Sequence, residues 1–576
     1  MSRSRRAAVA VPDTQPLTER VAALRACANR FGSEPAARKS ALLGACASCT
    51  LTDAEVLLAY HDCLLFLLAY PESAALLAAA RAELERVAAA ARVLLNAGPA
   101  RVRARLSNSG VAWAPMTIAF GYDIARWLVA CHPRNGEIDS FDEGGAPLRE
   151  LLRHALPAME FEMLSGEDVP AQDLLAEASA GHRGTRLAWL VAQCAKLPCP
   201  EGLREQLFDA LRAFITIDPG VTALSRTFVR GLAARTFFHR GDLKRVADPA
   251  ALITRPLAAP LALTRAQRVR LLDAGRATLA SLGRETDAIS AATPEGIEYH
   301  ALGRGVAIAL YTMAPGRRLP LDSHVGFMLF KNSIPVGYGG GWPFLGAAKI
   351  GVNIFAPFRG GESAWLFCQV LHVYSQRFGV DHFVAEPSQF GGGNREGLES
   401  GAFWFYYRLG FRPVVPRIAA IAAEEFALMR RKPGYRPPLT MLRRFARYDI
   451  ELRLQQGPEA LPVCDPADLS LAVSTWIAKR FQGDRARAMK FAVRTVARAL
   501  GAPDIARWPE AERDAFQSFC LLLARIPDLA RWPAPDKARV VALARAKGGD
   551  EYRYYDLLRS HARLAAALRE IAAQEG

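Results

Sequence analysis

The stretch from Lys349 to Leu371, KIGVNIFAPFRGGESAWLFCQVL, decides the fold that the sequence predicts. Its first seven residues are mostly β-branched or aromatic and predict a strand. From Ser363 onward, apolar residues follow at helical spacing until Gly379, which is a typical residue at the end of a helix. The stretch is therefore a strand, a glycine-rich turn and a helix.

The turn between this strand and this helix carries small residues where a ligand could approach. Arg359 begins it, Gly360 and Gly361 allow close contact, and Ala364 is too small to block it. Main-chain N–H groups at a helix N-terminus can bind a diphosphate without a cationic side chain. A turn of this kind can equally be a simple connection, so both interpretations stay open.

The flanking sequence extends this unit to a mixed α/β domain, about residues 291–416. Alternating or continuous apolar runs predict more strands, and the helix SGAFWFYYRL follows a glycine-rich loop. A polar connection, Lys331-Asn332-Ser333, predicts a hairpin. The predicted order is β-β-β-β-α-β-α-β. The predicted strands lie near residues 305–313, 324–330, 334–340, 349–355, 381–387 and 411–415.

Long helical regions flank this domain in the predicted architecture. Residues 15–290 are predicted to be α-helical, with a division at the loop-like stretch 132–145. Residues 417–576 are also predicted to be mainly helical, with one late strand in YDIELRL (448–454). Residues 1–14 are expected to be disordered.

Composition limits the class of protein and its partners. The chain has 576 residues, of which 51% are hydrophobic and 23% charged, as in a folded globular protein. Its net charge of +16 is spread along the chain, which favours solvated helix faces over a nucleic-acid groove. The most apolar stretch, 56–79, is interrupted by polar residues and is not expected to span a membrane. Without an apolar leader of the required length, a cytoplasmic location is expected.

Cys46 and Cys49 form a CxxC motif in GACASC. A zinc site needs further ligands nearby, and no second CxxC or HxxxH motif accompanies this one. We therefore expect no metal site, and we interpret the cysteines as reduced, small apolar residues.

A second motif indicates a resemblance to a known family. Ala402, Tyr406, Gly410 and Phe411 follow the pattern A-x-x-x-Y-x-x-x-G-F. With the turn at 359–364, this region resembles the GNAT superfamily of N-acetyltransferases, which has an R/Q-x-x-G-x-G/A turn and a later helix of this pattern. The resemblance covers roughly a fifth of the chain. It implies an acyl-CoA, such as acetyl-CoA, as co-substrate and an amine as acceptor.

The resemblance also implies the residues of the binding turn. They are Arg359, Gly360, Gly361, Glu362, Ser363 and Ala364. Glu362 departs from the family, which has glycine there, and its carboxylate would repel a diphosphate if it pointed inward. It can instead point to solvent or lie in the first helical turn, where the helix dipole favours an anion.

Catalytic roles follow from the same resemblance. Tyr406 is the expected acid that protonates the leaving thiolate, although its ring can also belong to the core. The amides of Ile354 and Phe355 are the expected oxyanion donors. Glu386 is the candidate general base, and Tyr338 and Trp342 are candidate walls of the acyl channel. The loop 389–397 is a candidate wall of the acceptor site.

Two alternatives remain beside an acyl-CoA-dependent acyltransferase. One is an aminoacyl-tRNA-dependent transferase of similar fold, whose basic helices would bind RNA with strong salt dependence. The other is a non-catalytic scaffold, for which Glu362 in the turn is the main argument.

Overall fold

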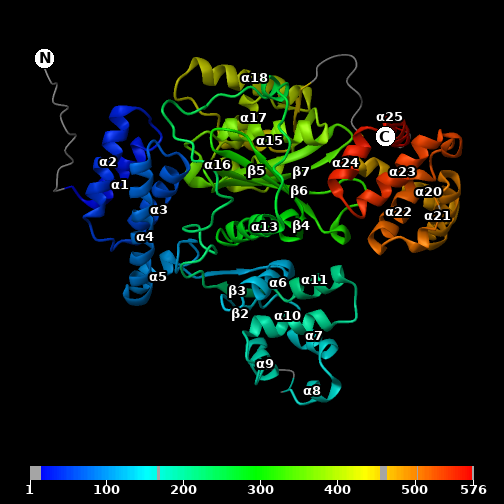
Figure 1. Cartoon of the computed structure of the whole chain (residues 1–576), viewed down its shortest axis with the longest axis horizontal. Helices are drawn as coiled ribbons and strands as arrows, with labels where there is room; N and C mark the ends of the chain where they lie inside the picture. Colours follow the sequence, from blue (N-terminus) through cyan, green and yellow to red (C-terminus); the bar gives the residue numbers. More distant parts are fainter. Residues whose placement is uncertain (1–14, 165, 167–168, 455–463, 503, 574–576) are drawn as a thin grey trace.

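The structure, a computed structural model, describes residues 15–164, 166, 169–454, 464–502 and 504–573. The expected disorder of residues 1–14 lies outside the described residues. A central mixed sheet lies between N-terminal helices on one side and C-terminal helices on the other (Figure 1). The mixed α/β architecture flanked by helices is thus confirmed.

The chain forms its elements in four successive parts. The N-terminal helices are α1 (Leu17–Cys27), α2 (Ser33–Ala47), α3 (Ala54–Ala69), α4 (Ala74–Ala97) and α5 (Ala100–Leu106). The second part contains β1 (Met116–Ala119), α6 (Tyr122–Cys131), β2 (Gly136–Phe141), α7 (Leu148–Ala155), α8 (Ala158–Glu162), α9 (Ala171–Ala178), α10 (Arg186–Lys196), α11 (Glu201–Ala210) and β3 (Ala213–Ile217).

The central part carries the large sheet. Its helices are α12 (Pro249–Ile253), α13 (Arg265–Ala280), α14 (Asp287–Ser290), α15 (Ser363–Phe378), α16 (Arg395–Glu399), α17 (Ala402–Arg408), α18 (Pro416–Arg431) and α19 (Leu439–Phe445). Its strands are β4 (Ala292–Ala301), β5 (Val306–Met313), β6 (Val325–Lys331), β7 (Ile334–Phe344), β8 (Ala347–Ile354), β9 (His382–Ala385), β10 (Arg412–Pro413) and β11 (Ile450–Arg453).

The C-terminal part is helical. Its helices are α20 (Pro466–Phe481), α21 (Arg485–Leu500), α22 (Glu510–Leu523), α23 (Ala534–Lys547), α24 (Glu551–Arg559) and α25 (Ala562–Ala573). Short 3-10 turns lie at η1 (Pro315–Arg317), η2 (Ala356–Phe358), η3 (Pro387–Gln389), η4 (Ile505–Arg507) and η5 (Leu529–Arg531).

The large sheet has the strand order β10-β11-β9-β8-β7-β6-β5-β4. Its neighbours are antiparallel except for β8 and β9, which are parallel and connected by α15. The predicted order is found from β5 to β10, and the late strand is β11. The first strand, β4, was not predicted, because ATPEGIEYHA carries a proline and two glutamates.

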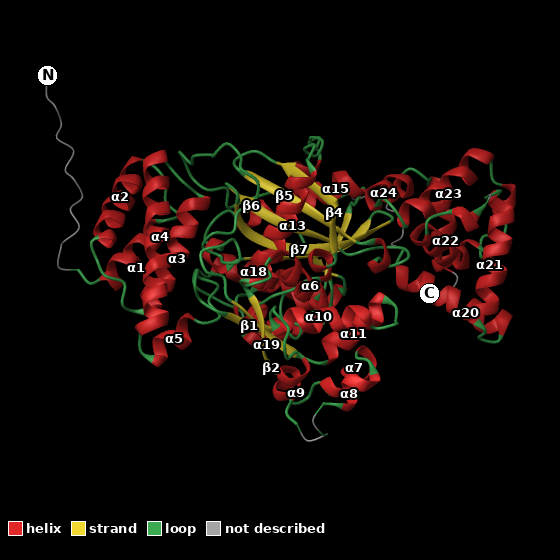
Figure 2. Ribbon diagram, turned by 60° about the horizontal axis from the view of Figure 1, so that its bottom comes forward, coloured by secondary structure: helices red, strands yellow, loops and turns green. Residues whose placement is uncertain are grey.

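Helices cover both faces of this sheet, which explains why β5 and β6 are buried along their whole length. On one face, the hydroxyl of Tyr311 in β5 donates to the carbonyl of Leu271 in α13 at 2.9 Å. On the other face, Phe327 of β6 lies 6.1 Å from the ring of Tyr374 in α15. The sheet and its covering helices are seen in Figure 2.

The hairpin between β6 and β7 turns on Asn332 and Ser333. Both have positive φ, 48° and 67°, as a two-residue type I′ turn requires. Lys331 was predicted to lie in this polar connection. It instead pairs with Ile334 as the last residue of β6, and it is fully buried.

The prediction that residues 15–290 are helical throughout is wrong in one part. The strands β1, β3 and β2 form a small antiparallel sheet there. The stretch 132–145, predicted as a loop, contains β2, which pairs with β3 about seventy residues later in the chain. In β3, AFITI alternates buried and half-buried residues, which is the strand signal that the prediction missed.

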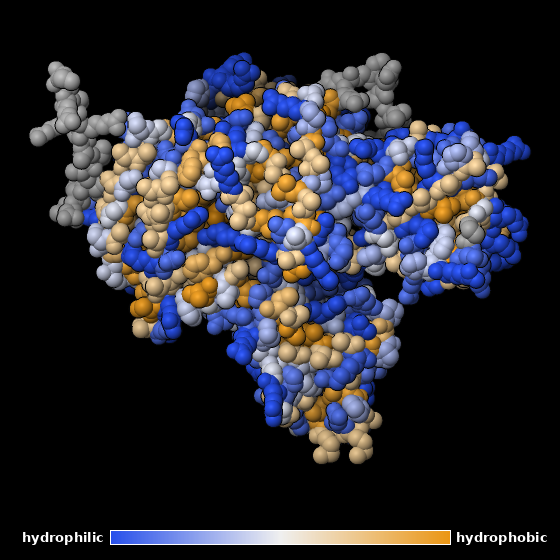
Figure 3. All heavy atoms as spheres, in the orientation of Figure 1, coloured by the Kyte–Doolittle hydropathy of each residue, from blue (hydrophilic) through white to orange (hydrophobic). Residues whose placement is uncertain are grey.

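Two large apolar cores divide the chain, and one of them is much more extensive than the other. One buried cluster runs from α1 through the large sheet to α25, whereas a second cluster lies under the small sheet. Hydrophilic side chains cover much of the visible face, with dense groups over α18 and the C-terminal helices (Figure 3). Among the described helices, none has the length and apolar character needed to cross a bilayer.

His239 gives the fold a specific sensitivity to acid. It is 2% exposed among the rings of Phe31, Tyr70 and Phe237, and neither ring nitrogen has a hydrogen-bond partner among the described residues. Burial, with a smaller effect of Lys331, lowers its pKa from 6.5 to about 3. The folded chain therefore keeps this imidazole neutral where the unfolded chain binds a proton.

We expect His239 to remove about 2 kcal/mol from the free energy of unfolding between pH 6.5 and about pH 5. Stability falls as pH falls, because only the unfolded state takes up the proton in this range. The variant His239→Gln, which cannot titrate, should lose that share of the pH dependence in urea unfolding. Equal acid sensitivity of both proteins would show that His239 is not the group responsible.

Candidate functional site

The candidate site lies where β8 and β9 separate. Residues 347–349 pair with residues 382–384. Beyond them β8 continues to Ile354 without β9 at its side, while its other edge stays paired with β7. A pocket of about 550 Å³ opens between this free half of β8 and the segment that follows β9. Residues of β7, α16 and α17 complete its walls.

The free half of β8 turns main-chain groups toward this pocket. The amide of Phe355 donates to the carbonyl of Val336 in β7 at 3.0 Å. Because alternate residues of an antiparallel strand face opposite edges, the amides of Val352 and Ile354 face the gap. The prediction of Ile354 as an oxyanion donor remains possible, whereas Phe355 is excluded because β7 already uses its amide. Sequence reasoning missed Val352.

Tyr406 lies beneath this gap and is 2% exposed. Its ring packs against Phe367 at 5.5 Å and Phe411 at 5.3 Å. Burial raises its pKa well above the usual value, against a smaller opposing effect of the Val352 amide. The hydroxyl completes no hydrogen bond with any described residue. It is therefore a protonated, buried donor beside the main chain of Val352, but Tyr406 is not among the residues that line the pocket, and its ring belongs to the core.

The predicted binding turn is split between the pocket and the interior. Arg359 and Ser363 line the pocket, and Gly360 is exposed beside them. Arg359 donates from Nε to the carbonyl of Ile354 at 3.0 Å and pairs with Glu396 at 2.6 Å. The first amides of α15 have no partner inside the helix, so those of Ser363 and half-buried Ala364 remain available there.

Gly361 and Glu362 face the N-terminal helices instead. A side chain on Gly361 would lie 2.6 Å from the hydroxyl of Tyr70 in α3, which leaves room for glycine only. The same hydroxyl accepts a hydrogen bond from the amide of Glu362 at 3.3 Å. This half of the turn therefore fixes α15 to the N-terminal helices rather than binding a ligand.

The carboxylate of Glu362 is fully buried in an ionic cluster. It lies 2.9 Å from Nζ of Lys331 and 2.6 Å from Nη2 of Arg304, and it accepts from the amide of Lys244 at 3.0 Å. Burial alone would raise its pKa, but Lys331 and these hydrogen bonds lower it overall. Glu362 therefore neither points to solvent, as one expectation had it, nor repels an anion in the pocket.

Glu386, the candidate base, lines the pocket at the end of β9. Its carboxylate lies 3.0 Å from Nζ of Lys349, and both side chains are nearly half exposed. An ion-paired, hydrated carboxylate is a weak base, so this position supports a role in binding a charged acceptor as much as a role in proton transfer.

His324 and Gln389 line the pocket; His324 was not predicted, whereas Gln389 belongs to the predicted acceptor loop. The ring of His324 stacks on Trp342 at 4.1 Å, where Gly340 leaves space for it. Burial lowers the pKa of His324 to about 4, so its imidazole is neutral at physiological pH. Gln389 lies over β8, and a side chain at Gly351 would be 2.2 Å from its Oε1. Both come from strand ends or loops, which periodicity does not identify.

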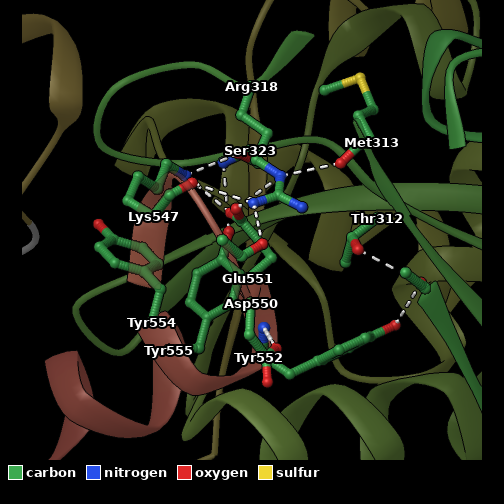
Figure 4. Close-up of polar contacts among 12 residues, drawn as sticks. Thr312, Met313, Arg318, Ser323, Lys547, Asp550, Glu551, Tyr552, Tyr554 and Tyr555 are labelled. Carbon is green, nitrogen blue, oxygen red and sulfur yellow. Dashed lines mark hydrogen bonds and ion pairs between the residues drawn. The ribbon is translucent and has the colours of Figure 1, made fainter. Parts of the chain in front are cut away.

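The segment that leads to His324 is held by the C-terminal helices (Figure 4). Nζ of Lys547 donates to Oγ of Ser323 at 2.7 Å, and the amide of Ser323 donates to the hydroxyl of Tyr555 at 3.2 Å. Glu551 pairs with Lys547 at 2.7 Å in the same cluster. One wall of the pocket therefore depends on helices more than two hundred residues later in the chain.

Cys46 is buried in α2, and burial raises the pKa of its thiol to about 11. Cys49 lies just beyond the helix, where its thiol donates to the carbonyl of Ala45 at 3.4 Å. Across the described residues, no group of three or more metal-ligating side chains comes together.

The pocket also contains Tyr338 and Trp342, the predicted channel walls, and Gln389 and Asn394 of the predicted acceptor loop. No family model matches the chain, and no curated protein or solved structure matches it. The geometry of the pocket is therefore the basis for assigning a function.

Proposed function

We propose that the protein is an acyl-CoA-dependent N-acyltransferase that transfers an acyl group from a CoA thioester to an amine. The observation that carries this proposal is the gap between β8 and β9. There, amides of β8 face the pocket, and the Tyr406 hydroxyl lies buried behind them, beside the main chain of Val352. The GNAT-like motifs fall on the same elements, which supports the proposal from the sequence.

The donor would lie along the free half of β8. Its diphosphate would bind the amides of Ser363 and Ala364 at the positive end of α15, beside the guanidinium of Arg359. The pantetheine arm would follow the main chain of β8 into the gap, where its thioester reaches Val352 and Tyr406. Gln389 lies over Gly351 and must rotate away, which the neighbouring Gly391 and Gly393 allow.

The chemistry is a direct transfer. The neutral amine attacks the thioester carbonyl and forms a C–N bond, and the amides of Val352 and Ile354 stabilise the oxyanion. The C–S bond then breaks, and the thiolate takes the proton of the Tyr406 hydroxyl while the amine loses a proton to solvent or to Glu386. Because burial raises the pKa of Tyr406, the hydroxyl is protonated before the thioester reacts, and the tyrosinate left after the transfer takes a proton back from solvent.

Isothermal titration calorimetry with acetyl-CoA and longer acyl-CoAs tests this proposal. We expect a Kd below about 1 mM for at least one of them. Arg359→Gln should raise that Kd by about tenfold, because a charged hydrogen bond to the diphosphate is lost. Arg395→Gln is the matched control, since Arg395 is exposed, lies outside the pocket lining and pairs with Glu399. Absence of binding by every acyl-CoA would contradict the proposal.

An aminoacyl-tRNA-dependent transferase is the second candidate, and one groove favours it. Between α18 and α19, a hollow of about 450 Å³ is lined by Arg417, Arg443, Arg444 and Arg447. These side chains are exposed, and none forms an ion pair with another described residue. Four guanidinium groups that form no ion pair with a described residue are suited to a phosphate backbone.

We expect this second candidate, if correct, to show tRNA binding that weakens steeply with salt. The double variant Arg443→Gln, Arg444→Gln should reduce the slope of log K against log salt by about 1 to 2, one unit for each phosphate contact. Filter binding between about 50 and 200 mM KCl measures it. An unchanged slope would place the RNA elsewhere, and absence of binding would leave acyl-CoA as the donor.

A further inference from the structure

A second pocket, of about 400 Å³, lies away from the gap between β8 and β9. Its walls come from α3 and α4, from the extended segment 228–236, from the turn at Asn332 and Ser333, and from α13. The N-terminal helices thus meet the central sheet at this point, and ligand pockets often form where such parts of a chain meet.

Three arginines line this second pocket, and we call it the arginine pocket. They are Arg81 of α4, Arg230 of the extended segment and Arg270 of α13. Among the described residues, none of the three forms an ion pair. Glu85 is the acidic residue in the wall, so the wall carries a net charge of 3 − 1 = +2.

Arg230 carries its charge at a desolvated position. Its guanidinium donates to the carbonyls of Val229 at 2.7 Å and Thr227 at 2.9 Å, which hold it in place without neutralising it. Burial, together with the nearby charge of Arg81, lowers its pKa from 12.5 to about 10. Two like charges that form no ion pair with a described carboxylate lower the stability of the free protein, and a bound anion would offset this loss.

Part of the remaining wall is apolar, and hydrogen bonds hold the extended segment in place. Leu68, Leu77 and Phe228 contribute apolar side chains to the pocket. The extended segment is fixed to the hairpin by a hydrogen bond from the amide of Gly231 to the carbonyl of Ser333 at 2.8 Å. A second, from the hydroxyl of Ser333 to the carbonyl of Leu232, measures 2.6 Å. The pocket is therefore preformed, with a cationic end and an apolar side.

We propose that the arginine pocket binds a small phosphate monoester whose organic part is apolar. A dianionic phosphate neutralises the net charge of the wall, and one guanidinium group can donate two parallel hydrogen bonds to two phosphate oxygens. The leucines and Phe228 then bury the organic part. This site is independent of the proposed acyl transfer, because none of its residues lines the pocket beside β8.

Calorimetry with phenyl phosphate, inorganic phosphate and phenol tests the site on the full chain. We expect phenyl phosphate to bind at least tenfold more tightly than inorganic phosphate, and phenol not to bind. Each of the variants Arg81→Gln, Arg230→Gln and Arg270→Gln should raise the Kd for phenyl phosphate by tenfold or more. Arg235→Gln should leave binding unchanged, since Arg235 is exposed in the same segment but lies outside the pocket.

Other outcomes overturn the proposal. If phenyl phosphate does not bind, the proposed site does not exist. If inorganic phosphate binds as tightly as phenyl phosphate, the apolar side chains do not contribute to binding. If Arg359→Gln or Arg443→Gln weakens binding and the pocket variants do not, the phosphate binds at one of the other basic sites. Arg81 and Arg270 are exposed helix residues whose replacement leaves the core intact, so they decide the question even if Arg230→Gln fails to fold.

Discussion

Replacing Tyr406 with phenylalanine should lower the kcat of acyl transfer by about 10²-fold to 10³-fold and leave the KM for acyl-CoA within about twofold. General acid catalysis contributes an effect of this size, and the hydroxyl is the only part of the side chain that the substitution removes. The ring contacts with Phe367 and Phe411 stay, so the walls of the gap keep their shape. Steady-state kinetics with the acyl-CoA found by calorimetry measures both constants.

The same substitution separates catalysis from folding. A buried hydroxyl that lacks a partner costs stability, so Tyr406→Phe should be neutral or slightly stabilising in urea unfolding. Tyr407→Phe is the matched control, because Tyr407 is buried beside it but packs against Phe426 rather than facing the gap. An unchanged kcat in Tyr406→Phe, or an equal loss in Tyr407→Phe, would refute the role of Tyr406 as acid.

Local patterns in the sequence were sufficient to predict the elements around the site. The strand before the turn, the helix from Ser363 and its end at Gly379 are all found, and Gly379 has the left-handed conformation with φ of 71°. These features depend on residues a few positions apart. Propensity and periodicity therefore predict them without knowledge of the rest of the chain.

The errors concern contacts between distant parts of the chain. The sequence left open whether Glu362 points inward, to solvent or into the first helical turn, because its partners Lys331 and Arg304 lie 31 and 58 residues away. Tyr70, whose hydroxyl accepts from the amide of Glu362, is 292 residues away in the sequence. Phe355 was expected to face the gap, but the pairing of β8 with β7 determines which amides are free. No local pattern contains this information.

The catalytic proposal depends on both kinds of feature. Tyr406 and Arg359 were found from the motifs and Gln389 from its loop, whereas Val352 and His324 became visible only once β8 and β9 were seen to diverge. A motif identifies side chains at fixed spacing. A main-chain donor has no sequence signature, because every residue except proline has an amide.

The largest effect on stability is expected for Glu551→Gln. Glu551 is 1% exposed between two cations, with Oε1 2.7 Å from Nζ of Lys547 and Oε2 3.1 Å from Nε of Arg318. Removing its charge leaves both cations buried without an anion, which typically costs about 3–5 kcal/mol. Chemical unfolding should show a loss of that size, whereas Glu399→Gln, which breaks an exposed pair with Arg395, should cost less than about 1 kcal/mol.

Glu551→Gln should also loosen the wall of the pocket beside β8. Lys547 holds Ser323, and Ser323 precedes His324, whose ring stacks on Trp342 inside that pocket. Hydrogen exchange of the amides at 321–325 should therefore increase in the variant under conditions where the rest of the sheet stays protected. The double variant Lys547→Met, Glu551→Leu also removes the charge of Lys547 and should recover part of the lost stability, whereas Arg318 still keeps a buried charge without its anion. If exchange at 321–325 is unchanged, the C-terminal helices do not control this wall, and His324 is held by its stacking on Trp342 alone.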